Sequence, residues 1–179
     1  LEAISAGLSA DDLLFLEQSL SDRSGKVKAQ ALELLSLIPE SALASRMRER
    51  GEGMLELATP KGGLKKVAAL LSGKGARLKI TPPADLPKEW EQDGVVAKPP
   101  QGMGPRAFWM MQVMALIAPS HWESRFGASP AELVRAAVDD EFATSLMQAW
   151  SRAATRFRLP LWVEALWDYW SAQKPAKVY

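Results

Sequence analysis

Hydrophobic residues recur at helical spacing in two stretches near the start of the chain. Leu13, Leu16 and Leu20 stand at positions i, i+3 and i+7, a spacing that places side chains on one face of an α-helix. The second stretch runs from about residue 24 to Pro39, and its apolar positions repeat in the same way: Val27, Ala31, Leu34, Leu35 and Ile38. The polar residues 21–25 between them predict a tight turn. The pattern therefore predicts two amphipathic helices joined as a hairpin over residues 11–39.

The pattern changes after a third, shorter helix predicted over residues 40–50 and stopped by Gly51. Two short runs with partial alternation of apolar and polar residues, 54–57 and 77–80, suit β-strands. The residues between them, 62–71, suit a helix. Residues 82–105 then carry six prolines, a composition that predicts an irregular connector.

Helical patterns dominate the rest of the chain. Pro105 and Pro160 each open an apolar-periodic stretch, Ser129 to Glu132 forms a capping box, and residues 142–158 repeat apolar side chains at helical spacing. The sequence therefore predicts a mainly α protein, a HEAT-like or irregular α-helical array with at most two short strands. We expect three parts: a helical block over 1–81, the connector over 82–105 and a Trp-rich helical block over 106–179.

Three motifs resemble known families. The hairpin with Asp22-Arg23-Ser24 in its turn, followed by Val27, resembles one HEAT-type repeat. The sequences PESAL (39–43) and GPRAFW (104–109) resemble the DUF5691 proteins, a bacterial family of unknown function. The resemblance supplies no activity. Genes of that family tend to lie near those of MoxR-type ATPases, von Willebrand A-type proteins and SWIM zinc-finger proteins, so it implies partners of those kinds.

Composition narrows the classes of function. The chain has no cysteine and one histidine, His121, which excludes thiolate metal sites and disfavours a His-based catalytic triad. We expect no cofactor and no metal. No apolar run reaches the roughly 18 residues of a membrane span, and the first residues lack the pattern of a secretory signal. We therefore expect a cytoplasmic protein without enzymatic activity. The acidic triplet 139–141 is interpreted as a helix cap, because it lacks the ligand spacing of a calcium loop.

Tryptophan is the most distinctive residue, with seven in 179 residues. Trp162 and Trp170 are eight residues apart, about two helical turns, and so share a face that Trp167 lies off. Apolar aromatic side chains left at a surface typify protein-binding sites. We therefore expect a protein–protein interaction scaffold that binds another protein through Trp109, Trp162 and Trp170.

The alternative is a nucleic-acid-binding HEAT-like protein, of the kind that includes DNA glycosylases. Its support is a basic stretch free of acidic residues, in which ammonium and guanidinium groups suit phosphate contacts: Lys61, Lys65, Lys66, Lys74, Arg77 and Lys79. A second group, Trp150 with Arg152 and Arg156, suits a groove that stacks bases and pairs with phosphates. Ordinary positions explain both sets better, since Lys is common on exposed edges and arginines near a helix C-terminus complement the helix dipole.

Overall fold

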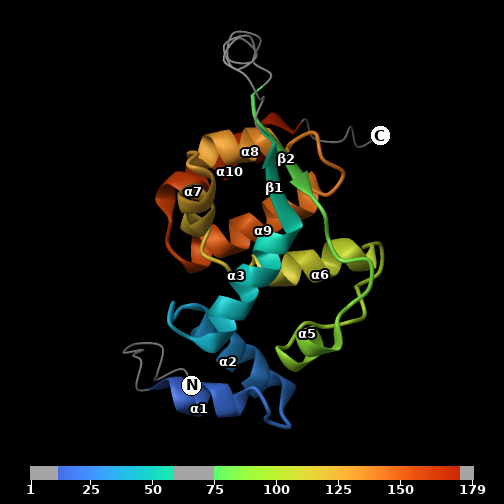
Figure 1. Cartoon of the computed structure of the whole chain (residues 1–179), viewed down its shortest axis with the longest axis vertical. Coiled ribbons are helices and arrows are strands. Elements are labelled where there is room, and N and C mark those ends of the chain that lie inside the picture. Colours follow the sequence, from blue (N-terminus) through green and yellow to red (C-terminus); the bar gives the residue numbers. More distant parts are fainter. Residues whose placement is uncertain (1–11, 59–74, 174–179) are drawn as a thin grey trace. The chain divides into compact units, whose positions relative to one another are not determined.

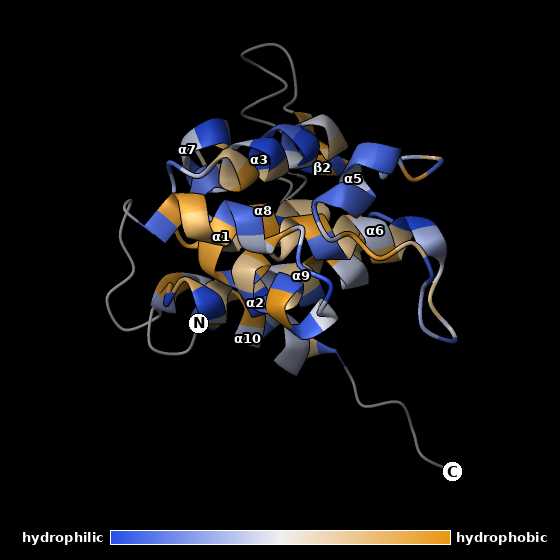
Figure 2. Cartoon of the chain, turned by 90° about the horizontal axis from the view of Figure 1, so that it is seen from below, coloured by the Kyte–Doolittle hydropathy of each residue, from blue (hydrophilic) through white to orange (hydrophobic). Residues whose placement is uncertain are grey.

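A computed structural model of the protein describes residues 12–58 and 75–173 (Figure 1). Within these ranges the chain is mainly α-helical, with one two-stranded antiparallel sheet, as the sequence predicts. The helix predicted over 62–71 lies outside the described residues. The helices carry hydrophobic and hydrophilic residues side by side (Figure 2), which is the amphipathic pattern of helices that bury one face.

The chain divides into two compact units, and each consists of two separate segments. The first contains residues 1–54 and 82–117, and the second contains residues 55–81 and 118–179. This division differs from the sequential one expected over 1–81, 82–105 and 106–179. The reason is physical: the proline-containing segment packs against the N-terminal helices, so it belongs to a folded unit.

The first unit begins with helices α1 (Leu13–Ser19), α2 (Gly25–Ser36) and α3 (Ala42–Met54). Asp22 Oδ1 accepts a hydrogen bond from the Ser24 N–H at 2.7 Å, and Ser24 Oγ accepts one from the Val27 N–H at 3.5 Å. The hairpin turn is therefore capped by both residues. Helix α3 continues through Gly51 to Met54, so the helix end predicted at that glycine is wrong.

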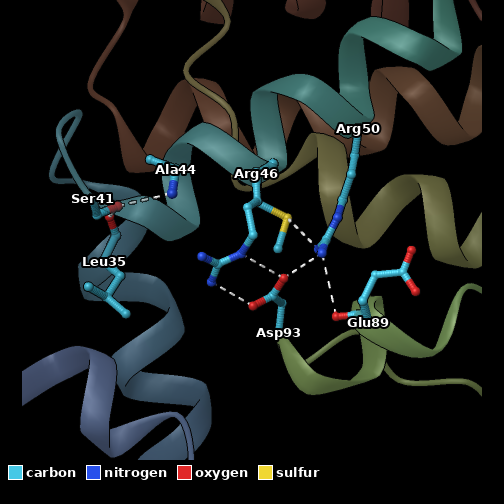
Figure 3. A network of polar contacts seen from close by, with 8 residues as sticks. Leu35, Ser41, Ala44, Arg46, Arg50, Glu89 and Asp93 are labelled. Carbon is cyan, nitrogen blue, oxygen red and sulfur yellow. Dashed lines mark hydrogen bonds and ion pairs between the residues drawn. The ribbon is translucent and has the colours of Figure 1, made fainter.

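An ion cluster joins α3 to the second segment of this unit, which holds α5 (Lys88–Gln92) and α6 (Pro105–Met114). Arg46 and Arg50 point from α3 toward the buried Asp93, which follows α5 (Figure 3). The Arg50 guanidinium also lies 5.2 Å from the centre of the Trp90 ring. Hydrogen bonds from Arg46 to Asp93 raise the pKa of Arg46 above its ordinary value. Two cations on one carboxylate fix residues 88–94 against α3.

Among the described residues, the second unit contains the sheet and four helices. Strands β1 (Leu55–Ala58) and β2 (Arg77–Ile80) pair antiparallel, with Leu55 opposite Ile80, which confirms the predicted strands to within one residue. The helices are α7 (Ser120–Phe126), α8 (Pro130–Ala137), α9 (Ala143–Arg156) and α10 (Pro160–Ala172). Helix α10 packs against both α8 and α9, and α8 packs against β2.

Asp140 connects the sheet to the helices of this unit. Its Oδ2 accepts a hydrogen bond from the Ile80 N–H at 3.0 Å, and its Oδ1 accepts one from the Phe142 N–H at 2.9 Å. One carboxylate thus satisfies a backbone donor at the end of β2 and another at the entry to α9. The N-cap of α9 is Phe142, so the interpretation of the acidic triplet as the N-cap is wrong: Asp140 instead accepts from the N–H of the N-cap residue, two positions later.

Candidate protein-binding surface

The start of helix α10 is defined by the turn that precedes it. The preceding helix ends in a left-handed residue, Arg158, with φ 53°, and the Leu159 N–H donates to the Ala154 carbonyl at 2.9 Å. This is the bonding of a Schellman cap. Pro160 then occupies the first turn of α10, where its missing N–H costs nothing. The two helices are thereby joined by a turn of three residues.

Helix α10 buries one face and leaves other large apolar side chains in water. Trp162, Ala165 and Leu166 are buried. By contrast Trp167 is 71% exposed and Leu161 66% exposed, and Val163 is exposed to a lesser degree. Val163 and Trp167 are four residues apart and so are neighbours on the helix surface. Exposed apolar side chains grouped on one helix are the kind of surface that binds other proteins.

The three tryptophans predicted to bind a partner occupy different environments. Trp162 is 1% exposed, packs edge-on against Trp150 at 5.0 Å and donates its indole N–H to Glu123 at 2.7 Å. It therefore belongs to the core and offers no surface to a partner. Trp170 is half-buried and donates to Ser151 Oγ at 3.1 Å.

The predicted tryptophans are divided between the two units. Trp109 lies in the first unit, half-buried, and donates to the Ala97 carbonyl at 2.8 Å. Trp162 and Trp170 lie in the second unit. The more exposed tryptophan is Trp167, which is not one of the three predicted residues because it lies off the Trp162 face. Its four-residue spacing from Val163 was the signal that could have identified it.

A groove of about 550 Å³ runs between α8 and α10. Its floor is apolar, with Val134 and Ala165 both buried. Its walls include two charged side chains, Arg135 from α8 and Asp168 from α10. The full lining is Ala131, Val134, Arg135, Val138, Ala165, Asp168, Tyr169, Ala172 and Gln173. No residue of this groove except Ala131, which is part of the capping-box stretch, was singled out by sequence reasoning.

The capping box predicted at Ser129 holds the start of α8 beside this groove. Glu132 Oε2 accepts hydrogen bonds from the Ser129 N–H at 2.8 Å and from the Ser129 hydroxyl at 2.7 Å. These two bonds, the backbone one first, lower the pKa of Glu132 below its ordinary value. The charged carboxylate therefore contributes to the order of the helix start.

The candidate nucleic-acid contacts are only partly described. Lys61, Lys65, Lys66 and Lys74 lie outside the described residues. Arg77 is exposed and forms an ion pair with Asp139 at 3.6 Å, and Lys79 is exposed on β2.

The tryptophan of the second nucleic-acid set is buried. Arg152 is exposed and Arg156 is half-buried on α9. Trp150 on the same helix is 0% exposed, so its ring cannot stack on a base. Base stacking at this position is therefore excluded by burial, and of this set only the two arginines remain as candidate contacts.

In residues 12–58 and 75–173, no three acidic or histidine side chains come together as a metal-binding group. Across the same ranges, none of the helices combines the length and hydrophobicity needed to cross a bilayer.

The fold and the exposed helix define a mainly α-helical protein with an apolar surface on its last helix. The chain belongs to the family described as "Family of unknown function (DUF5691)", whose model matches residues 1–178. The predicted resemblance of the chain to this family is thereby confirmed. No curated protein and no solved structure shows significant similarity to the chain.

Proposed function

We propose that the protein is a non-enzymatic interaction scaffold that binds another protein through α10 of its second unit. The observation that carries the proposal is the exposure of Trp167, the largest apolar side chain that the described residues leave in water. Removing an indole ring from water is strongly favourable, and tryptophan is enriched among the residues that dominate binding energy at protein interfaces.

The rest of α10 supports this assignment. Val163 extends the exposed apolar area beside Trp167, and the helix is fixed by Trp162 and Leu166 in the core beneath it. A rigid helix presents its side chains without the entropy cost of ordering a loop. The partners implied by the family resemblance are MoxR-type ATPases, von Willebrand A-type proteins and SWIM zinc-finger proteins, and a cytoplasmic location suits such partners.

A pairwise binding assay tests the proposal. The full chain is immobilised, and purified candidates of the three classes implied by the family resemblance are passed over it. We expect one of them to bind, and Trp167→Ser to weaken binding by about a hundredfold, the loss typical of removing a tryptophan at the centre of an interface. Trp162→Ala is unsuitable for this purpose because Trp162 is a core residue.

Leu14→Ser is the matched control. Leu14 lies on α1 of the first unit and is 71% exposed, the same fraction as Trp167. Circular dichroism and thermal unfolding verify that both variants fold. Equal binding by the wild type and Trp167→Ser, or a loss caused by Leu14→Ser alone, would reject α10 as the binding surface.

Nucleic-acid binding is the alternative proposal. Its support is the exposed charge of Arg77, Lys79 and Arg152, although Arg77 is paired with Asp139. A gel-shift titration with duplex DNA at several salt concentrations separates the two functions. Phosphate binding requires affinity that falls steeply as salt rises, and the absence of any shift at low salt removes this alternative.

A further inference from the structure

The groove between α8 and α10 is built from two matching stripes of side chains. Helix α8 and its C-cap contribute residues 131, 134, 135 and 138, and α10 contributes residues 165, 168, 169 and 172 together with its C-cap, Gln173, outside the four-residue set. Both sets follow the spacing i, i+3, i+4, i+7. This is the spacing with which a helix presents one face to a packed neighbour, so each helix directs two turns of its surface into the groove.

The sizes of the lining residues suit a third helix. Val134 and Ala165 are buried and form an apolar floor, whereas Ala131 and Ala172 are exposed. Alanine at the walls leaves room for the backbone of a neighbour to approach, and helices pack by fitting the side chains of one into the space between rows of another. Two helices lined in this way form a groove of the kind that receives an amphipathic helix.

Two charges determine what such a helix must carry. Arg135 stands on the α8 side and Asp168 on the α10 side, and both are exposed. Neither takes part in the ion pairs Arg46–Asp93, Arg50–Asp93 or Arg77–Asp139. Arg135 Nε donates to the Ala131 carbonyl of its own helix at 3.2 Å. A ligand with an acidic residue beside Arg135 and a basic residue beside Asp168 is complementary in charge, and the asymmetry fixes its orientation.

We propose that this groove binds an amphipathic helix of a partner protein, with apolar residues at i, i+3, i+4 and i+7 toward Val134 and Ala165. An acidic side chain of that helix pairs with Arg135 and a basic one with Asp168. The inference rests on the proposed scaffold function, because it names the class of partner that the same unit recognises. A second copy of this chain is the alternative occupant of the groove, and the experiment below distinguishes it from a partner helix.

The test uses a displayed library of 14-residue amphipathic helices, randomised at the apolar and flanking charged positions, and selected against the full chain. Selected peptides are synthesised and titrated. We expect them to share the four-position apolar spacing, to become helical on binding, and to lose at least about tenfold in affinity for Ala172→Trp. That substitution places a large ring in the groove at an exposed position.

Two matched controls lie on the same helix. Ser171 and Glu164 are exposed on α10 and do not line the groove. Ser171→Trp should therefore leave peptide affinity unchanged, although it adds the same ring one residue away. Asp168→Arg should reduce affinity about tenfold, and replacing the peptide's basic residue with Glu should restore it. Glu164→Arg should have no comparable effect.

The outcomes decide between the occupants. Peptides that bind Ala172→Trp as well as wild type, or a selection that yields no helical binder, would overturn the groove assignment. Sedimentation showing a wild-type dimer that Ala172→Trp dissociates would overturn it in favour of a second copy. A protein partner lost on Trp167→Ser and kept on Ala172→Trp would reject the groove while leaving the scaffold function intact. If selected peptides bind the groove but no protein partner binds the chain, the scaffold function would be rejected while the groove assignment stays intact.

Discussion

Arg46 forms a two-pronged ion pair with Asp93, in which Nε donates to Oδ2 at 3.0 Å and Nη2 donates to Oδ1 at 2.7 Å. Residue 46 lies in α3 and residue 93 lies 47 positions later in the chain. Arg50 donates to the same carboxylate and to the Glu89 carbonyl. The cluster therefore holds two distant segments of the first unit together.

Asp93→Ala should lower the free energy of unfolding by about 3 kcal/mol, because it leaves two guanidinium groups without their carboxylate. The side chain of Arg50 is only 10% exposed, so water cannot fully replace the lost partner. Arg46→Lys is the matched variant and should cost about 1 kcal/mol, since an ammonium keeps the charge and loses the second prong. Urea unfolding monitored by tryptophan fluorescence measures both. Equal costs for the two variants would contradict the shared-carboxylate explanation.

Glu132→Gln should make stability less dependent on acid pH. Hydrogen bonds from Ser129 lower the pKa of Glu132 from its ordinary value of 4.5, so the folded state favours the carboxylate. That contribution is present above pH 4.5 and is lost as the pH falls through the lower folded-state pKa. Glutamine retains an acceptor for the capping box but does not titrate.

Thermal unfolding of the wild type and Glu132→Gln between pH 7 and pH 3 measures the effect. We expect the wild type to be the more stable protein at pH 7, and the difference to shrink toward pH 3. A difference that stays constant over this range would show that the charge of Glu132 does not contribute. Ser129→Ala, which removes the capping hydroxyl, should cost about 1 kcal/mol at neutral pH.

Gly94→Ala should cost more than Gly102→Ala. Both glycines have φ +85°, a left-handed conformation that costs an L-residue about 1–2 kcal/mol. A Cβ at Gly94 would lie 3.2 Å from Leu32 Cδ1, whereas a Cβ at Gly102 would meet nothing within 4 Å. The comparison isolates the contact with Leu32, because the backbone strain is the same. Gly94→Ala combined with Leu32→Ala should remove the difference attributable to that contact, and a double-mutant cycle in urea checks it.

Local signals in the sequence predicted much of the fold. Pro105, Ser129-Pro130 and Pro160 each mark a helix start that the structure confirms, because proline in the first turn and a capping box act within a few residues. The two strands were also predicted from a local signal, the alternation of apolar and polar residues. By contrast the interleaved units depend on contacts such as Arg46–Asp93, between residues far apart in sequence. No local pattern specifies which arginine a given aspartate will meet.

The candidate surface was harder to predict than the helix that carries it. Trp162, Trp167 and Trp170 all lie on α10, and their burial depends on where α8 and α9 pack. Spacing shows which residues share a face, but it does not show which face is covered. Sequence reasoning therefore selected Trp162, which is buried, and set aside Trp167, which is exposed. The groove residues are mostly alanine and valine, which have no distinctive signal in a single sequence.

Arg158→Gly should stabilise the protein. Arg158 has φ 53° at the position after α9 where glycine is preferred, since the left-handed conformation costs other residues about 1–2 kcal/mol. Glycine removes that strain but adds about 0.4–1 kcal/mol of unfolded-state entropy, so the net gain should be about 0.5–1 kcal/mol. Arg158→Ala is the control: it removes the side chain, keeps the strain and should bring no gain. Differential scanning calorimetry should show Tm rising by about 1–4 °C for Arg158→Gly, and an equal rise for Arg158→Ala would attribute the effect to the lost charge.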